Sequence, residues 1–238
     1  MRQLILDTET TGLPAKNTEE AVAESGHRVI EIGVVEIVDR RITGNDFQSY
    51  LNPERKIDPN SIPIHGISDK DIADKPLFKN LVGDFLDYVK GAEVIIHNAD
   101  FDRSFINNEL ALLGLNHRLE ELCDITDTLI IARKKFPGKR NSLDALCSFY
   151  GVDMTSREVH GALIDAKLLS HVYLLMTGGQ AGFFNQDQTN ANESSDDNHD
   201  YDFKKRKIIQ IDLNEDELKN HQSYLKKLSK SSKKDLDW

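Results

Sequence analysis

The sequence has little of several features that define whole classes of protein. Its 238 residues include only two cysteines, Cys123 and Cys147, which provide neither a disulfide framework nor a set of zinc ligands. No apolar run approaches the roughly 18 residues that a membrane-spanning helix needs. Acids at Asp7 and Glu9 directly follow the short apolar segment 4–6, a pattern unlike the apolar core of a signal peptide. We therefore expect a cytoplasmic protein without a membrane partner.

Positive charge is also scarce. The chain has 30 Lys and Arg against 40 Asp and Glu, which gives a formal net charge of −10. Such a balance argues against a protein that holds nucleic acid by bulk electrostatic attraction. It is compatible with a phosphate-handling enzyme whose bound metal ions supply the positive charge.

The charge is distributed unevenly along the chain. Residues 178–200 contain five acids, no Lys or Arg and almost nothing apolar, which predicts a flexible linker. The domain boundary is expected at the Gly178-Gly179 pair, with one domain over 1–177. Residues 201–238 carry ten basic and seven acidic side chains and too few apolar ones to fold alone, so we expect this tail to fold on a partner.

Hydrophobic periodicity in the domain alternates between strand-like and helix-like. It predicts strands at 4–6, 29–38, 47–51 and 94–96, and helices at 77–89, 101–113, 142–149 and 162–176. The strands at 29–38 and 47–51 should form a hairpin, and Gly178 should close the last helix. This order predicts an α/β fold with a mixed sheet flanked by helices.

Two acids stand at the end of the first predicted strand. Asp7 and Glu9 are two positions apart, so their side chains point to the same face of the strand while Thr8 points to the other. Two carboxylates this close repel each other unless a cation lies between them, and Mg²⁺ or Mn²⁺ prefers oxygen ligands. The alternative to a metal site is that the two acids simply lie in solvent at the end of a strand, where Asp is common.

A second acidic pair follows the predicted strand at 94–96. If the next helix begins near Phe101, Asp100 is placed as its N-cap and Asp102 lies in its first turn. We interpret Asp100 as a cap and Asp102 as the candidate metal ligand.

The third group joins His160 and Asp165. Residues five apart on one helix differ by about 140°, so the two can cooperate only if His160 lies in the preceding loop, with Gly161 allowing the bend. Asp165 would then be a metal ligand. A loop histidine that titrates near neutrality suits a general base, although a lone histidine is more often an ordinary surface residue.

Together the three groups resemble the Asp-Glu-Asp-Asp, histidine-type (DEDDh) 3′–5′ exonucleases. The resemblance covers about 1–177 and implies a ribonuclease H-like fold. It also implies two divalent cations, Mg²⁺ or Mn²⁺, that stabilise the oxygens of a displacement at phosphorus. The cations would be held by Asp7, Glu9, Asp102 and Asp165, with His160 as general base.

Longer motifs resemble the epsilon (DnaQ-type) proofreading subunits of bacterial DNA polymerase III. These are Asp-Thr-Glu-Thr-Thr-Gly (7–12), Ile-Glu-Ile-Gly (30–33), His-Gly-Ile (65–67), Phe-Pro-Gly-Lys-Arg-Asn-Ser-Leu-Asp-Ala-Leu (136–146) and Met-Thr-Gly-Gly-Gln (176–180). The resemblance implies removal of mispaired 3′-terminal nucleotides as monophosphates from single-stranded or frayed DNA. It also implies substrate contacts from Asp7, Thr8, Glu9, Thr10, Gly12, His65 and Asp165. Asn60 stands at a contact position where the family often has an acid.

The same resemblance implies partners. Gln180, Phe183 and Phe184 resemble, within 180–184, a short motif that binds the sliding clamp. The alternative is that the two phenylalanines fold back onto the domain. The tail at 201–238 would bind the polymerase alpha subunit in a bacterial replisome, or else be a solvated basic tail; a small theta-like subunit is a further candidate partner.

Two other functions are consistent with parts of the sequence. A DEDDh exoribonuclease would use the same five site residues, but it needs neither linker nor tail. A mainly structural adaptor between polymerase and clamp would not need Asp7, Glu9, Asp102, His160 and Asp165, all of which are present. We therefore favour the DNA exonuclease.

Overall fold

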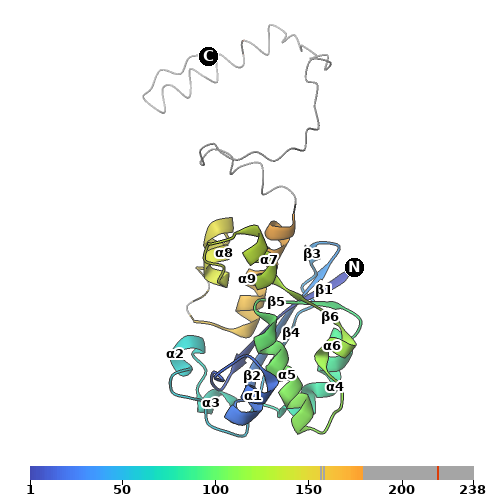
Figure 1. Cartoon of the computed structure of the whole chain (residues 1–238), viewed down its shortest axis with the longest axis vertical. Helices are drawn as coiled ribbons and strands as arrows, with labels where there is room; N and C mark the ends of the chain where they lie inside the picture. The colour runs from blue at the N-terminus through green and yellow to red at the C-terminus, as the bar shows by residue number, and fades with distance from the viewer. Residues whose placement is uncertain (156, 158, 179–218, 220–238) are drawn as a thin grey trace. The chain divides into compact units, whose positions relative to one another are not determined.

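The computed structural model describes residues 1–155, 157, 159–178 and 219 (Figure 1). The predicted linker beyond Gly178, the segment 180–184 and the predicted tail apart from Lys219 lie outside these residues. Within the described part of the chain, no helix is long and apolar enough to cross a membrane. The elements in chain order are β1 (Arg2–Thr10), α1 (Glu19–Ser25), β2 (Val29–Val38), β3 (Arg41–Ile42), β4 (Phe47–Tyr50), α2 (Ile62–His65), α3 (Asp69–Ile72), α4 (Phe78–Val89), β5 (Glu93–Ile96), α5 (Ala99–Leu112), α6 (Leu119–Leu122), β6 (Asp124–Asp127), α7 (Thr128–Lys135), α8 (Leu143–Tyr150) and α9 (Ala162–Thr177).

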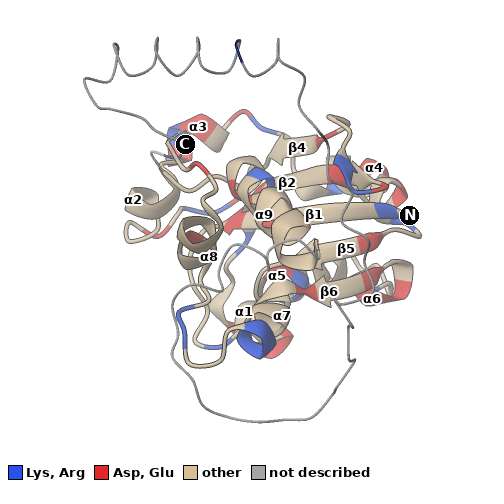
Figure 2. Ribbon diagram, turned by 90° about the horizontal axis from the view of Figure 1, so that it is seen from above, with Lys and Arg blue, Asp and Glu red and all other residues tan. Residues whose placement is uncertain are grey.

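The strands form one mixed sheet in the order β3-β2-β1-β5-β6, with β4 also paired to β2. β1 is antiparallel to β2 and parallel to β5, and β5 is parallel to β6. The predicted hairpin is confirmed by the antiparallel pairing of β2 and β4, in which Glu31 lies opposite Tyr50. Figure 2 shows β4, β2, β1, β5 and β6 side by side, with α9 lying across β2 and β1.

Both faces of the sheet are covered by helices. Leu4 and Leu6 of β1 belong to a core shared with α4 and α5, whereas Ile5 packs with Ile95 and with Leu169 of α9 on the opposite face. This split follows from the two-residue period of a strand. Continued along β1, the same alternation directs Asp7 and Glu9 to the α9 face, and Thr8 and Thr10 to the other.

Helices α4, α8 and α9 lie close to their predicted ranges, but α5 begins two residues before the prediction. Its N-cap is Asn98, in the left-handed conformation with φ 71°. The first amides of the helix are satisfied by a distant carboxylate: Asp127 accepts hydrogen bonds from the amides of Asn98 and Ala99, at 3.2 and 3.1 Å. The prediction that Asp100 caps α5 is therefore wrong.

Helix α9 ends close to its predicted end, but the backbone at the closing residue has a different conformation from the one predicted. The helix ends at Thr177, and the amide of Gly178 donates to the carbonyl of Leu174 at 2.9 Å. Gly178 has φ −79°, so this stop does not use the left-handed conformation that favours glycine. The elements α1, β3, α2, α3, α6, β6 and α7 were not predicted, because most of them are too short to show a period.

Candidate active site

The position of α9 over the sheet is set by a glycine. Gly33 of β2 pairs with Asp7 of β1, and a Cβ atom at Gly33 would lie 2.2 Å from the Leu163 nitrogen and 2.3 Å from the Ala162 carbonyl carbon. The first turn of α9 thus rests directly on the backbone of β2 beside Asp7. This contact brings Asp165, in the first turn of α9 and 4% exposed, to the end of β1.

Glu31 fixes the start of the same helix. It lies opposite Glu9 across the β1–β2 pair, is buried, and accepts a hydrogen bond from the Ala162 amide at 3.0 Å. Its other oxygen accepts from Gln48 at 2.8 Å. Gly161, just before the helix, has φ −161°, an extended conformation open to any residue, so the bend does not need a glycine there.

Asp102 is held by the opposite face of β1. It lies in the first turn of α5, is 3% exposed, and accepts a hydrogen bond from the Thr8 hydroxyl at 2.6 Å. Thr8 does point away from the face of Asp7 and Glu9, as the strand period predicts. Its hydroxyl positions a carboxylate, a contact that the sequence pattern did not indicate.

His160 lies in the loop before α9, as predicted, because the helix begins at Ala162. Its Nδ1 atom is 3.0 Å from Oδ2 of Asp165, and its side chain is 45% exposed. Ligand atoms of Glu9, His160 and Asp165 all lie within 4.8 Å of one another. The His160 amide also donates to the carbonyl of Ile64 at 2.9 Å, which ties this loop to α2.

Arg157 was missed by the sequence reasoning. Its Nε atom is 2.6 Å from Oδ1 of Asp165, and its Nη2 atom is 2.7 Å from Oδ2 of Asp165 and from Nδ1 of His160. Its Nη1 atom contacts Asp144 in the first turn of α8. Arg157 stands in an irregular segment with no periodic pattern, so only its place three residues before His160 could have indicated a role.

We call Asp7, Glu9, Asp102 and Asp165 the carboxylate cluster. Burial, reinforced by the charges of Asp102 and Glu9, holds the pKa of Asp7 well above its ordinary value. Burial and the charge of Asp165 raise the pKa of Glu9 to about 8, and burial raises that of Asp102 to about 7. The fold therefore concentrates negative charge that is poorly compensated. A set of oxygen donors of this kind matches the ligand preference of hard divalent cations.

Two of the predicted substrate-binding residues have a clear place near this cluster. His65 of α2 is 4% exposed, and its Nδ1 accepts a hydrogen bond from the Ile67 amide at 3.0 Å, so Nε2 carries the proton. Among the described residues this buried Nε2–H has no hydrogen-bond partner. Burial, and then the neighbouring His160, lower the pKa of His65. The buried Thr10 hydroxyl donates to the Gly12 carbonyl at 2.9 Å, which shapes the chain after β1.

Of the remaining predicted contacts, Asn60 lies on the surface, Gly12 is buried, and the clamp-binding residues lie outside the described residues. Asn60 is exposed, and its side-chain amide donates to Asp58 at 3.0 Å. Gly12 packs so closely on the His27 ring that a Cβ atom there would lie 2.1 Å from Cε1. The predicted clamp-binding residues Gln180, Phe183 and Phe184 lie outside the described residues.

Comparisons with known proteins agree with this fold. The family model described as Exonuclease matches residues 4–173. DNA polymerase III subunit epsilon of Pasteurella multocida is 44% identical over 244 residues, covering 100% of this chain and 93% of that protein. The Escherichia coli (strain K12) protein of the same name is 51% identical over 180 residues, covering 75% of this chain and 72% of its own length.

Solved structures show the same fold. Exonuclease X in complex with 5′ overhanging duplex DNA superposes with a TM-score of 0.55 at 25% identity, covering 73% of this chain and 90% of that one. The nuclease domain of 3′hExo, a DEDDh family member bound to rAMP, gives a TM-score of 0.62 at 19% identity, covering 74% and 90%.

The mixed sheet flanked by helices is the ribonuclease H-like fold of the DEDDh exonucleases, as predicted. Within this class the chain belongs to the family of DNA polymerase III epsilon subunits. The predicted activity, a 3′–5′ proofreading exonuclease that acts on DNA, is confirmed at the level of this family. Membership also implies dependence on a divalent metal.

Proposed function

We propose that the chain removes mispaired nucleotides, as monophosphates, from single-stranded or frayed 3′ ends of DNA with two divalent cations, Mg²⁺ or Mn²⁺. The observation that carries this proposal is the convergence of half-buried carboxylates from β1 and buried ones from α5 and α9 with the loop histidine His160. The raised pKa values of Glu9 and Asp102 support it, because a bound cation would stabilise the charged carboxylates that burial, and at Glu9 also the charge of Asp165, disfavours.

In this proposal the carboxylate cluster, Asp7, Glu9, Asp102 and Asp165, holds the cations. Bound cations supply Lewis-acid stabilisation of the attacking and leaving oxygens at phosphorus. His160 is the general base. In the tautomer whose Nδ1–H donates to Asp165 at 3.0 Å, Nδ1 does not accept from the neighbouring Arg157, whose Nη2 then donates to Asp165. Nε2 is then the nitrogen that accepts a proton from the attacking water. Its partial exposure leaves room for that water.

The terminal nucleotide would bind between β1 and α2. The buried Nε2–H of His65 is a donor that an acceptor on the nucleotide would satisfy, which removes the cost of leaving it unpaired. Thr8, Thr10 and Gly12 would line the same site. Asn60 would contact the nucleotide from the surface, where its side-chain amide now donates to Asp58. Mispaired ends are favoured because a frayed terminus enters a single-strand site at lower cost than a paired one.

The catalytic proposal is tested by degradation of single-stranded DNA in Mg²⁺ or Mn²⁺. Asp7→Ala is expected to abolish measurable activity. His160→Ala is expected to lower kcat by roughly 10²- to 10⁴-fold, the range of general acid–base catalysis. His117→Ala is the matched control, since His117 is an exposed histidine far along the chain from the motifs. Undiminished activity in either site variant would contradict the assignment, and faster degradation of a matched RNA would contradict the DNA preference.

The partners are proposed from the relatives, which are subunits of DNA polymerase III. The tail at 201–238 would bind the alpha subunit, 180–184 would bind the sliding clamp, and a theta-like subunit would bind the catalytic domain. Removing residues 180–238 is expected to abolish co-purification with the polymerase while exonuclease activity persists. Loss of both together would show instead that these residues complete the catalytic domain. Phe183→Ala with Phe184→Ala is expected to weaken clamp binding alone.

A further inference from the structure

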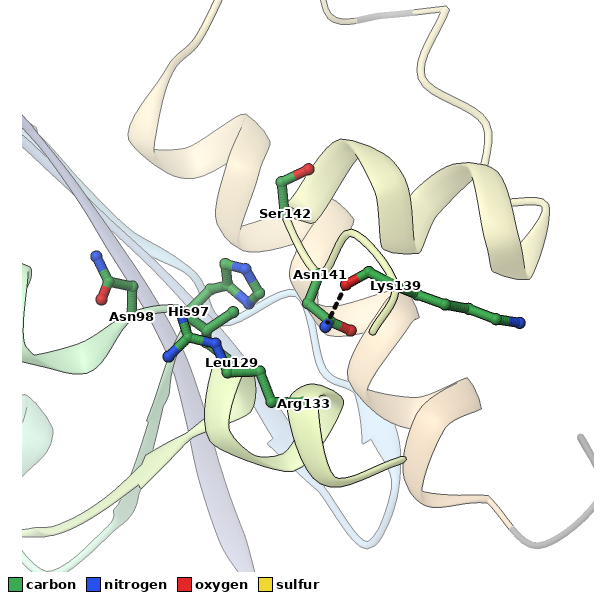
Figure 3. A pocket seen from close by; sticks show the side chains of 7 residues that line it. All are labelled: His97, Asn98, Leu129, Arg133, Lys139, Asn141 and Ser142. Atoms are coloured by element: carbon green, nitrogen blue, oxygen red, sulfur yellow. Dashed lines mark hydrogen bonds between the residues drawn. The ribbon is translucent and has the colours of Figure 1, made fainter. Parts of the chain in front are cut away.

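A basic pocket lies between β5, α7 and the loop that leads into α8. It has a volume of about 500 Å³, within the usual range for ligand pockets. His97 and Asn98 line one side, Arg133 another, and Asn141 and Ser142 the side of α8 (Figure 3). In Figure 3 the Arg133 guanidinium lies near His97, while the Lys139 ammonium extends outward at the rim. That ammonium lies 5.4 Å from the centre of the Phe149 ring.

Positive charge is concentrated in this region. Residues 133–140 contain five Lys and Arg and no Asp or Glu, on a chain whose net charge is −10. None of the ion pairs found among the described residues involves any of these five cations. A run of basic residues is often only a solvated face. Here it borders a hollow that also presents amide and hydroxyl groups, which is the composition of an anion site.

The pocket is attached to the carboxylate cluster on both sides. β5 runs parallel to β1 with Ile95 opposite Ile5, so His97 and Asp7 follow at the same end of neighbouring strands. Asn98 is the N-cap of α5, which carries Asp102 in its first turn.

The other wall is connected to the cluster through α8. Ser142 caps α8, where its hydroxyl accepts from the Ala145 amide at 3.3 Å. Asp144 in the first turn of the same helix contacts Arg157, which pairs with Asp165. The pocket therefore flanks the cluster rather than lying on a remote surface.

We infer that this pocket binds a backbone phosphodiester of the single strand upstream of its 3′-terminal nucleotide, with Arg133 as the main cation and Lys139 at the rim. The inference rests on the proposed function. The physical need is direct: the carboxylate cluster repels every phosphate except the one that the cations hold, so an adjacent phosphate needs a separate positive contact. Grooves that bind single strands combine such cations with polar groups.

The test compares Arg133→Gln with Lys134→Gln. Both remove one positive charge from exposed positions of α7, but Lys134 does not line the pocket. Dissociation constants for a labelled single-stranded 12-mer are measured by anisotropy with Mg²⁺ in a His160→Ala background, over a range of salt. One phosphate contact contributes about 0.7 to the salt slope, so Arg133→Gln should lower the slope by about 0.7 and weaken binding about fivefold at 0.1 M salt. Lys134→Gln should change both much less. Equal effects of the two variants, or none in Arg133→Gln, would overturn the inference.

A second measurement separates this inference from the proposed function. An aryl ester of thymidine 5′-monophosphate offers a terminal nucleotide without an upstream phosphodiester. The ratio of kcat/KM for the 12-mer to kcat/KM for the ester should fall about fivefold in Arg133→Gln in the otherwise unmodified chain. An unchanged ratio, with both substrates hydrolysed by the wild type, overturns the inference alone. If the wild type hydrolyses neither of the two substrates, the proposed function is overturned.

Discussion

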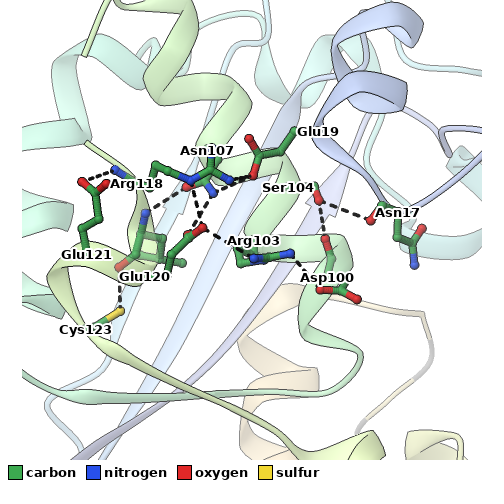
Figure 4. Close-up of polar contacts among 11 residues, drawn as sticks. Asn17, Glu19, Asp100, Arg103, Ser104, Asn107, Arg118, Glu120, Glu121 and Cys123 are labelled. Atoms are coloured by element: carbon green, nitrogen blue, oxygen red, sulfur yellow. Dashed lines mark hydrogen bonds and ion pairs between the residues drawn. The ribbon is translucent and has the colours of Figure 1, made fainter. Parts of the chain in front are cut away.

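Two groups of charged residues in this domain are built in opposite ways. The first, which we call the paired network, joins α1, α5 and α6 (Figure 4) and consists of Glu19, Asp100, Arg103, Asn107, Arg118 and Glu120. Asn107 donates to Glu19 and to Glu120, each at 3.0 Å, and Arg118 pairs with both acids. Burial would raise the pKa of Glu120, but the hydrogen bonds from Asn107 and Arg118 prevail and lower it.

The second group, the carboxylate cluster, brings acids together with little compensation. The pKa of Glu9 is raised to about 8, the reverse of the shift at Glu120. Arg157 is the cation that the described residues place against Asp165. The difference fits a different role for each group: the paired network fastens helices, whereas in our proposal the carboxylates of the cluster are left for an ion that the chain does not itself supply. Most of the following predictions perturb the cluster or its surroundings and use the paired network as reference.

Among the changes compared between the two groups, the largest effect is expected at Asp102. Asp102→Asn removes a charged ligand from the cluster, so kcat/KM should fall by about 10³-fold, or about 4 kcal/mol of transition-state stabilisation. Asp100→Asn, two residues away in the paired network and exposed, should stay near wild type in the same assay of single-stranded DNA degradation. Similar losses in the two variants would show that the first turn of α5, and not the Asp102 carboxylate, is what matters.

Arg157→Gln should leave Asp165 buried without its cation. Their side chains are 9% and 5% exposed, so the free energy of unfolding in EDTA should fall by about 3 kcal/mol, and Mg²⁺ should restore part of the loss. The reference is Arg103→Gln, whose pair with Asp100 is largely exposed and is worth at most about 1 kcal/mol. Urea denaturation of both variants, with and without metal, checks this. A loss that Mg²⁺ does not relieve would count against Arg157 as a counter-ion of the cluster.

Gly33→Ala should displace α9, because the new Cβ atom would meet the Leu163 nitrogen at 2.2 Å. A misplacement of about 1 Å at the cluster can lower activity roughly 100-fold, or about 2.7 kcal/mol. Gly83→Ala in α4, where a Cβ atom meets nothing within 4 Å, should keep activity and add about 0.5–1 kcal/mol of stability. Steady-state kinetics and thermal melts of the two variants test the contrast; wild-type kinetics in Gly33→Ala would refute it.

The smallest expected effect is in the pH dependence of stability. Glu9 has a folded-state pKa of about 8 against an ordinary 4.5, so its contribution is fully present below about 4.5 and is lost as pH rises through 8. In EDTA, the free energy of unfolding of the wild type should therefore fall between about pH 6 and 9. In Glu9→Gln this fall should be smaller by about 2 kcal/mol. Mg²⁺ should also flatten the wild-type profile.

Glu120→Gln serves as the control for this measurement. The folded-state pKa of Glu120 is lowered, so its contribution is present above the ordinary value and is lost only in acid. Between pH 6 and 9 its profile should run parallel to wild type. Parallel profiles for Glu9→Gln and wild type would show that the pKa of Glu9 is not raised in the folded protein.

Local rules indicated the acids of the carboxylate cluster because those acids lie on regular elements. The strand period placed Asp7 and Glu9 together and Thr8 opposite, and the helix period required His160 to precede α9. Longer motifs then indicated the family. The same rules failed at the start of α5, where Asp127, from another strand, satisfies amides that the local sequence assigned to Asp100.

By itself the sequence determined that the site has carboxylate and imidazole side chains, and it determined the strand and helix periods that orient them. It also placed the glycine at position 33. Only the tertiary structure decided which acids become neighbours. The pairing of β1 with β2 sets Glu31 beside Glu9, the crossing of α9 at Gly33 delivers Asp165, and the Thr8 hydroxyl holds Asp102. The physical reason is that charge repulsion and burial depend on distances between segments far apart in the chain, and those distances exist only once the sheet and helices have packed.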